Sequence, residues 1–462
     1  MLPPFNPWLL SRIAADVVAA SHADAEALAA RQSQRLADLL ASAASSSPLY
    51  RRLLKGSDPA HLQLDELPVM GKAVLMSQFD DWVTDPALHL DALRRFTADR
   101  SRIAEPFLGR YVVWESSGSS GEPGIFVQDA AAMAVYDALE AVRRPVLRPL
   151  QRLLDPWCMG ERIAFVGATD GHFASTVTLE RIKRLNPAMS RCLHGISFLL
   201  PPEQLMAKVQ ALDPTVIATY PSAAVLLAEE RLAGRLEIAP REVWTGGETL
   251  SVSMRKLVQQ AFGCQVVDSY GASEFISMAI DCPYGHLHLN SDWVILESVD
   301  DQGRVLPAGE AGTSTLLTNL ANHVQPLIRY NLGDSIRLYS HACACGSHLP
   351  VIEVQGRSDD TLRLGRPGEK AVSVLPLAFS TVLEEGAGLF DFQIVQQGPS
   401  ELLLSTGMRG EAAIGIVQRA GVVLAAFLAQ QGLPDVTIHC LSDHPARQGR
   451  SGKIQRVVAL KP

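Results

Sequence analysis

The middle of the chain alternates between short apolar runs and longer amphipathic stretches. Apolar runs of strand length occur between residues 161 and 274, and segments with helical spacing of apolar residues separate them. The predicted strands span residues 163–166, 216–220, 242–245 and 264–269, and the predicted helices include 202–212 and 222–232. Strands joined by crossover helices indicate a mainly parallel sheet whose ligand sites lie beyond the carboxyl ends of its strands. We therefore expect an α/β fold with its chemistry in the loops that follow these strands.

Three other regions have different patterns. Helical periodicity predicts a helix from about residue 23 to 54, and short β-rich runs between Gly and Pro turns predict a β subdomain at 286–338. The last part of the chain mixes strand-like runs with one helical run, which predicts a small mobile α+β domain. A polar segment before it resembles a linker. We divide the chain into a large multi-subdomain domain (1–355), a hinge (356–360) and a small carboxyl-terminal domain (361–462).

Composition supports a globular enzyme. The 462 residues exceed what one core usually contains, and 47% of them are hydrophobic against 19% charged. The 41 basic and 49 acidic residues leave a net charge of −8 without a basic block, which argues against nucleic acid as a partner. Arg12 and Asp16 interrupt the first apolar stretch, and we find no run long enough to span a bilayer. We expect a cytoplasmic protein with no membrane partner, and a homodimer is among the assemblies that the sequence allows.

Glycine and serine are concentrated directly after the strand-like run 111–115. Glycine lets backbone N–H groups approach phosphate oxygens closely, and serine hydroxyls add donors, so this composition suits a triphosphate. A flexible loop is the alternative that composition alone favours, and no Gly-Lys-Ser/Thr closes the segment as in a P-loop. The candidate phosphate-binding residues are Ser116, Ser117, Gly118, Ser119, Ser120 and Gly121.

Five further motifs follow this segment in order. They are Thr245-Gly246-Gly247-Glu248, Asp268-Ser269-Tyr270-Gly271-Ala272-Ser273-Glu274, Tyr330-Asn331-Leu332-Gly333-Asp334, Gly356-Arg357-Ser358-Asp359-Asp360 and Gly452-Lys453. Their order and spacing resemble the adenylate-forming (acyl-CoA synthetase) superfamily, and within it the phenylacetate–coenzyme A ligase-like branch. The resemblance runs from about Arg31 to Lys453 and includes Arg35-Leu36, Ser47-Pro48-Leu49-Tyr50-Arg51 and Leu67-Pro68 with Lys72.

The resemblance implies a role for each motif. The Gly/Ser segment would hold the β- and γ-phosphates, Tyr270 would stack on adenine, Glu274 would help to hold Mg²⁺, and Asp334 would accept both ribose hydroxyls. Arg357 would reach the nucleotide, Asp359 would act as the hinge, and Lys453 would stabilise charge at the α-phosphate. Each residue also has an ordinary explanation: a strand-end turn, a turn-forming Asp, a solvated lysine. Further nucleotide-binding positions implied are Gly247, Glu248, Ser269, Gly271, Ala272 and Ser273.

The acid pocket carries the weakest sequence signal. The resemblance places an aromatic-bearing acid-pocket motif near Ala168 to Ala174, so His172 and Phe173 would line the substrate. Tyr136 and Tyr220 would complete the wall. All four are equally consistent with core or loop positions.

Cysteine and histidine suggest a second site that does not involve ATP. Seven cysteines, an odd number, do not indicate a disulfide framework. Cys282, His288, Cys343 and Cys345 together would form a closed tetrahedral set for structural Zn²⁺, and some members of the resembled branch carry a metal at a similar place. Scattered free cysteines are the alternative, with His286, His341 and His348 as competing ligands.

The function implied is ATP- and Mg²⁺-dependent activation of a carboxylic acid, aromatic in this branch, with transfer of the acyl group to coenzyme A. Alternatives are transfer to an amine or a carrier protein, adenylylation of another coenzyme, and a nucleotide-binding protein without catalysis. Glu122 stands where many relatives have lysine, and Asn331 and Leu332 stand where Arg and Thr are common. These departures leave the acceptor more open than the adenylation step.

Overall fold

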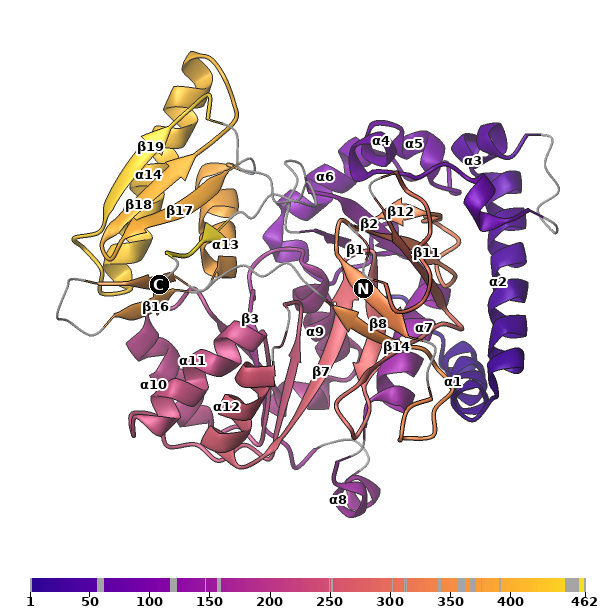
Figure 1. The fold of residues 1–462 in the computed structure, drawn as a ribbon, viewed down its shortest axis with the longest axis horizontal. Helices are drawn as coiled ribbons and strands as arrows, with labels where there is room; N and C mark the ends of the chain where they lie inside the picture. Colours follow the sequence, from indigo (N-terminus) through magenta and orange to yellow (C-terminus); the bar gives the residue numbers. More distant parts are fainter. Residues whose placement is uncertain are drawn as a thin grey trace.

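The structure is a computed structural model with a large α/β part and a smaller carboxyl-terminal part beside it (Figure 1). The smaller part, from β15 onward, lies at the upper left of Figure 1, and the long helix α2 borders the opposite side. The residues that the structure describes are 2–55, 62–116, 123–145, 147–155, 159–248, 250, 252–300, 302–310, 312, 314–339, 342–354, 362–365, 371–374, 376–389, 392–444 and 457–460.

A nine-stranded mixed sheet forms the centre of the large part, in the order β13-β14-β9-β8-β7-β6-β5-β3-β4. Its parallel half confirms the predicted strands and consists of β3 (Ile163–Gly167), β4 (Leu193–Ser197), β5 (Val216–Thr219), β6 (Glu242–Gly246) and β7 (Gln265–Ala272). The other half is antiparallel and consists of β8 (Phe275–Asp281), β9 (Leu287–Leu289), β14 (Val351–Val354) and β13 (Ile336–Tyr339).

Helices cover both faces of the parallel half because side chains alternate along each strand. Ala164 and Val166 of β3 pack in one apolar cluster with α10 (Pro202–Leu212), α11 (Pro221–Leu232) and α12 (Val252–Phe262). Ile163, on the opposite face, packs with Leu179 of α9 (Ala174–Leu185), which is followed by the 3-10 turn η3 (Pro187–Arg191). The predicted helices 202–212 and 222–232 correspond to α10 and α11.

The predicted β subdomain contributes to two sheets. β10 (Val294–Val299), β11 (Ser314–Asn319) and β12 (Tyr330–Asn331) form a separate three-stranded antiparallel sheet. β9 and β13, which also lie in the predicted region, extend the large sheet instead. This arrangement brings the Tyr330 motif next to the turn that follows β7.

The amino-terminal helices pack around the largest apolar cluster. They are α1 (Pro7–Ser21), α2 (Ala25–Ser46), α3 (Pro48–Leu53), η1 (Leu64–Glu66), α4 (Lys72–Ser77), α5 (Phe79–Trp82), α6 (Leu90–Ala98) and η2 (Arg100–Arg102). The single helix predicted over 23–54 is interrupted at Ser47, whose hydroxyl caps α3 by accepting from the Tyr50 N–H. Pro48 at the first position of α3 explains the break, because proline disfavours helical geometry in the residue before it.

Two strands and two helices complete the large part. β1 (Val112–Glu115) pairs antiparallel with β2 (Ile125–Gln128), α7 (Ala130–Arg143) follows, and α8 (Pro149–Leu154) projects from the body. Arg143 at the end of α7 makes two hydrogen bonds to the carboxylate of Asp292, at 2.7 and 2.9 Å, and the Asp292 side chain is fully buried. Arg35 of α2 contacts the same carboxylate at 3.5 Å, so the network ties α2 and α7 to the segment before β10.

The carboxyl-terminal part has its own sheet and its own apolar cluster. A four-stranded sheet runs β19 (Thr437–Leu441), β18 (Glu401–Ser405), β17 (Gln393–Gly398) and β20 (Val457–Val458), and β15 (Leu362–Leu364) pairs with β16 (Val372–Val374). α13 (Pro376–Ala387) and α14 (Glu411–Gln430) pack on each other and on this sheet. The predicted α+β pattern is therefore observed, while the predicted hinge 356–360 lies outside the described residues.

Helix α14 is long and apolar enough, by length and composition alone, to cross a membrane. The sequence pattern predicted this helix only as the helical run of the small carboxyl-terminal domain, and Gln418 and Arg419 lie among its apolar residues. Its buried residues, among them Val417, Leu424 and Leu428, face the carboxyl-terminal cluster. In this structure α14 is the central helix of an α+β unit.

Candidate active site

Several predicted nucleotide-binding residues lie at neighbouring strand ends of the large sheet. Gly247 and Glu248 follow β6, Ser269 ends the parallel stretch of β7, and Tyr270 comes directly after it; Tyr220, a predicted acid-pocket residue, follows β5. A Cβ atom on Gly247 would lie 3.1 Å from the Tyr220 ring, and the φ angle of Gly247 is +80°. The site therefore uses glycine at this position both for its backbone conformation and for the close approach of the tyrosine.

A second glycine shapes the turn between β7 and β8. A Cβ atom on Gly271 would lie 2.2 Å from the carbonyl oxygen of Ile276, where the pairing register shifts between Tyr270 and Ala272. No other residue fits there without moving the β8 backbone. The Ser273 carbonyl accepts a hydrogen bond of 2.8 Å from the Trp114 indole, which anchors the turn to β1.

Two tyrosine–carboxylate pairs connect the β7 motif to the Tyr330 motif. The Tyr270 hydroxyl donates to Oδ2 of Asp334 over 2.8 Å, and the Tyr330 hydroxyl donates to Oε1 of Glu274 over 2.9 Å. Asn319 of β11 donates to the Glu274 carbonyl at 2.9 Å. The structure thus brings together the three residues that were predicted to contact adenine, ribose and Mg²⁺, although they are far apart in sequence.

The Tyr330 motif was predicted as part of the site, but no role was predicted for Tyr330 itself. Tyr330 is 3% exposed, and its hydroxyl orients the carboxylate predicted to hold the metal. Asn331 and Leu332, which depart from the common pattern, form an ordinary turn: Asn331 Oδ1 accepts from the Gly333 N–H at 2.9 Å, and Leu332 is buried. The altered motif therefore still presents Asp334 to Tyr270.

The Gly/Ser segment begins at a hairpin. Ser116 bonds twice to Gly124, through its N–H and through its side-chain oxygen, each at 2.8 Å, just beyond the last pair of β1 and β2. Next to it, the Glu115 N–H donates to the His172 carbonyl at 2.7 Å. The base of the predicted phosphate loop is therefore joined to the predicted acid-pocket loop.

The four predicted acid-pocket residues have different surroundings. Tyr136 lies in the core, 1% exposed, with its ring 4.9 Å from that of Phe275. His172 is also fully buried, its ring 5.3 Å from that of Phe96, and burial lowers its pKa. Phe173 and Tyr220 are half-buried and pack against the carboxyl-terminal cluster. Burial raises the pKa of Tyr220 to about 12, so its hydroxyl stays protonated at neutral pH.

The remaining predicted residues lie outside the part of the chain that the structure describes. They are Ser117, Gly118, Ser119, Ser120, Gly121, Arg357, Asp359 and Lys453.

A contact between the large part and the carboxyl-terminal part lies beside the acid-pocket loop. Arg100 pairs with Asp170 at 2.5 Å and with Glu385 of α13 at 3.2 Å. The Glu385 side chain is 19% exposed, and burial, together with Asp170 and Glu115, raises its pKa to about 7 against the opposing effect of Arg100. Glu385 therefore titrates near neutral pH while it faces the loop that carries His172.

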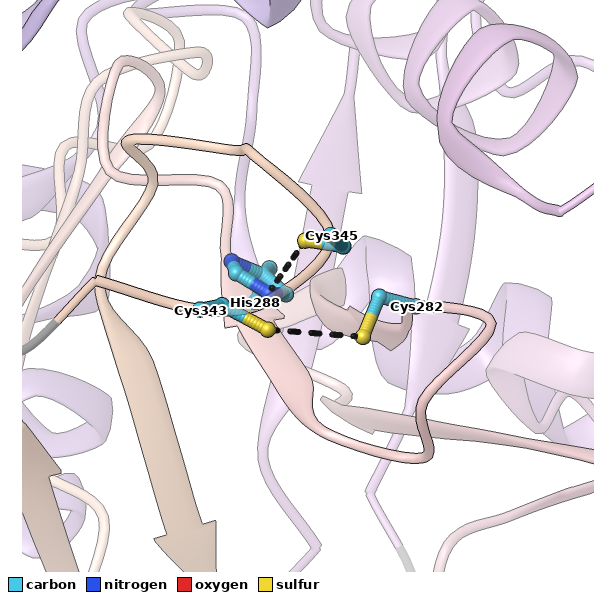
Figure 2. Close-up of side chains that lie close together, drawn as sticks. All are labelled: Cys282, His288, Cys343 and Cys345. Atoms are coloured by element: carbon cyan, nitrogen blue, oxygen red, sulfur yellow. Dashed lines mark hydrogen bonds between the residues drawn. The ribbon is translucent and has the colours of Figure 1, made fainter.

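The predicted cysteine and histidine set meets at one point (Figure 2). The ligand atoms of Cys282, His288, Cys343 and Cys345 all lie within 4.8 Å of one another. Cys282 Sγ lies 3.9 Å from Cys343 Sγ, and Cys345 Sγ lies 3.3 Å from His288 Nε2. Zn–S bonds of about 2.3 Å in a tetrahedron would separate two sulfurs by about 3.8 Å, so these spacings fit zinc.

The surroundings of this set also suit a metal. Nδ1 of His288 lies 2.8 Å from the Leu349 carbonyl, so it carries the proton and leaves Nε2 as the ligand atom. Burial acts to raise the pKa of Cys343, but hydrogen bonds from the Cys345 N–H and from His286 lower it to about 5. His286, one of the competing ligands, is exposed, and its Nδ1 lies 3.3 Å from Cys343 Sγ. This distance fits a hydrogen bond from His286 to the sulfur.

Comparisons with known proteins show which enzymes this chain resembles. A family model described as "AMP-binding enzyme" matches residues 187–313, which include Gly247, Glu248 and the segment from Ser269 to Glu274. A phenylacetate-coenzyme A ligase of Thermus thermophilus is 28% identical over 377 residues, covering 78% of this chain and 75% of that protein. The corresponding ligase of Pseudomonas putida is 28% identical over 191 residues, or 38% of this chain and 40% of that protein.

Solved structures share the fold. A 2-hydroxyisobutyryl-CoA ligase, in complex with 2-HIB-AMP and CoA in the thioesterification state, aligns with a TM-score of 0.56 at 21% identity. That alignment covers 95% of this chain and 91% of the ligase. The postadenylation state of the same ligase, in complex with R3-HIB-AMP, aligns with a TM-score of 0.54 at 20% identity and covers 96% and 91% of the two chains. The mixed α/β architecture with a second carboxyl-terminal unit is therefore that of known acyl-CoA ligases.

Proposed function

We propose that this chain is an adenylate-forming enzyme, an AMP-forming ligase that joins an aromatic carboxylic acid to coenzyme A. The observation that carries the proposal is the pair of contacts Tyr270–Asp334 and Tyr330–Glu274, which gathers residues for adenine, ribose and metal from separate motifs. The similarity to a phenylacetate-coenzyme A ligase supports both the acid class and the acceptor.

In the first step, an oxygen of the substrate carboxylate attacks the α-phosphorus of ATP. A new O–P bond forms, the bond from the α-phosphorus to the bridging oxygen breaks, and pyrophosphate leaves. Tyr270 offers an aromatic face to adenine, and Asp334 offers carboxylate oxygens to the ribose hydroxyls. The Tyr330 hydroxyl holds the Glu274 carboxylate in place. Carboxylate oxygens are ligands that Mg²⁺ prefers, and a bound Mg²⁺ would neutralise charge on the phosphates.

In the second step, the thiol of coenzyme A attacks the acyl carbonyl carbon of the acyl-AMP. The thiol proton goes to solvent, the C–S bond forms, and AMP leaves with both electrons of the C–O bond. An aromatic acid suits the rings of Phe173, Tyr220 and Phe198, of which Phe198 and Tyr220 lie edge to face at 6.0 Å.

Acid-dependent exchange of labelled pyrophosphate into ATP tests the first step. We expect exchange with phenylacetate or another aromatic acid and none without acid. Absence of exchange across a panel of aromatic, aliphatic and hydroxy acids, with ATP binding retained, would favour a nucleotide-binding protein without catalysis.

Discharge of the acyl-AMP tests the second step. We expect coenzyme A to accelerate AMP release and to yield a thioester, detected by mass spectrometry. If an amine or a carrier-protein thiol accelerates release and coenzyme A does not, the proposed acceptor is wrong while the adenylation step stands.

We also propose that Cys282, His288, Cys343 and Cys345 bind one structural Zn²⁺. Three sulfurs and one imidazole fill a tetrahedron, so no position is open for substrate and no reaction step uses the ion. Metal analysis of the purified protein tests this directly, and a zinc content near zero after purification without chelators would contradict it.

A further inference from the structure

Buried polar side chains lie directly beneath the strand ends that carry the candidate nucleotide-binding residues. Thr245 of β6 and Asp268 of β7 face each other in the pairing register and are 3% and 6% exposed. The Thr245 hydroxyl donates to Oδ1 of Asp268 over 2.6 Å. Burial raises the pKa of Asp268 to about 6, although the Thr245 hydroxyl acts to lower it. The Asp268 carboxylate is therefore almost shielded from water, and its charge depends on hydrogen bonds from protein donors.

The same two strand ends make further close contacts. The Ser269 hydroxyl donates to the Thr245 carbonyl at 3.0 Å. A Cβ atom on Gly246 would lie 2.8 Å from the Ser269 Oγ, so the two strands approach more closely here than side chains would allow. These contacts hold the ends of β6 and β7 close together directly before Gly247 and Tyr270.

Asp268 is also held from its other side. Its N–H donates to Oδ2 of Asp281 at 2.7 Å, and the same oxygen accepts from Nη2 of Arg255 at 2.6 Å. Arg255 of α12 also donates to the Val266 carbonyl at 2.7 Å. The Asp281 side chain is 2% exposed, so this support is itself buried. The β7 strand is thus held in place beneath the site by a charged pair on one side and by Thr245 on the other.

We propose that Asp268 is a positioning residue: through Thr245 it holds the ends of β6 and β7 in the register that presents Gly247, Glu248 and Tyr270 to ATP. The inference rests on the proposed function, because it assigns a task to residues beneath the nucleotide. Asp268 itself does not touch the substrate. Its effect passes through the backbone, and it acts on nucleotide affinity more than on overall stability.

Four single variants and one double variant test this role. Thr245→Val removes the hydroxyl with almost no change in shape, Thr245→Ser restores it, and Asp268→Asn removes the carboxylate charge. Thr219→Val is the matched control, since Thr219 is also a buried strand threonine, 6% exposed, whose hydroxyl donates to the Val166 carbonyl at 2.7 Å. Calorimetric titration with Mg·ATP, the KM for ATP in pyrophosphate exchange, and the melting temperature are measured for each.

We expect Thr245→Val to raise the Kd and KM for ATP about tenfold and to lower kcat less than threefold. Thr245→Ser should stay within threefold of wild type. Thr219→Val should lower the melting temperature about as much as Thr245→Val but leave the KM for ATP within twofold. The double variant Thr245→Val/Asp268→Asn should raise KM by less than the product of the two single effects, because both substitutions act on the same Thr245–Asp268 contact: one removes its donor and the other removes the charge of its acceptor.

Two outcomes would overturn the inference. One is unchanged ATP affinity in Thr245→Val despite a lower melting temperature, and the other is multiplicative effects in the double variant. Failure of the proposed function is recognised separately, because in that case the wild-type protein itself would not bind Mg·ATP in the titration.

Discussion

Substitution of Tyr330 with phenylalanine is a sharp test of the site, because the side chain loses only its hydroxyl group. Tyr330 is 3% exposed and donates to Oε1 of Glu274 at 2.9 Å. Phenylalanine fills the same volume, so the core around β12 should remain packed. The Glu274 carboxylate loses a donor that fixes its direction, and the proposed Mg²⁺ contact loses its orientation.

The magnitude follows from the kind of contact. A hydrogen bond to a charged group contributes about 1.5–3 kcal/mol, and each 1.36 kcal/mol corresponds to a factor of ten in rate or affinity. Tyr330→Phe should therefore lower kcat/KM for ATP–pyrophosphate exchange by about 10- to 150-fold. The Mg²⁺ concentration for half-maximal exchange should rise in parallel, since the Glu274 carboxylate is no longer held in one orientation.

The assay is pyrophosphate exchange at saturating acid, with Mg²⁺ and ATP varied separately. Tyr339→Phe is the control, because the Tyr339 hydroxyl also donates to a carboxylate, Glu353 Oε2 at 2.8 Å, but the Glu353 side chain is 51% exposed. Water replaces that contact, and we expect an effect below twofold. An exchange rate for Tyr330→Phe within threefold of wild type, with unchanged Mg²⁺ dependence, would refute the reasoning about Glu274.

Three further predictions concern stability, metal and pH. Asp292→Ala should lower the free energy of unfolding in urea by about 3–5 kcal/mol, because it leaves the buried Arg143 guanidinium without the carboxylate that balances its charge; a loss below 1 kcal/mol would contradict this. Chelation of zinc, or Cys345→Ser, should lower the melting temperature and release the metal, whereas Cys264→Ser, outside the cluster, should retain one zinc per chain. The raised pKa of Glu385, about 7 against an ordinary 4.5, contributes stability that is complete below pH 4.5 and is lost as pH rises through 7. Between pH 5 and 7.5 the melting temperature of Glu385→Gln should therefore fall by less than that of the wild type. Equal falls would show that the Glu385 carboxyl does not cause the pH dependence.

Much of the fold follows from local sequence, because strands buried on both faces and amphipathic helices have distinct periods. The parallel strands β3, β5, β6 and β7 were predicted within a few residues of their observed bounds. The division of the β-rich region between two sheets was not predicted, because β13 reaches the large sheet only through β14, which pairs with the distant strand β9. Periodicity along one strand contains no information about which strand will be its neighbour.

The candidate site shows the same limit. Motif order predicted Tyr270, Glu274 and Asp334 as site residues, but the hydroxyl donors that orient the two carboxylates lie in other motifs and become visible only in three dimensions. Tyr136 has the chemistry of a substrate wall, and only its neighbours reveal that it lies in the core. The metal set was the opposite case: side-chain chemistry and the family resemblance together suggested Cys282, His288, Cys343 and Cys345, and the structure brings these four residues together.

The loop from Ala168 to Phe173 contacts both the base of the predicted phosphate segment and the carboxyl-terminal part. On one side the His172 carbonyl accepts from Glu115, at the base of the predicted phosphate segment, and on the other side Asp170 shares Arg100 with Glu385 of α13. Phe173 packs with the carboxyl-terminal cluster. Movement of the carboxyl-terminal part would therefore have to break the Arg100–Glu385 pair and uncover Phe173. Because the same loop would line the acid, the position of the carboxyl-terminal part and the shape of the acid pocket cannot change independently.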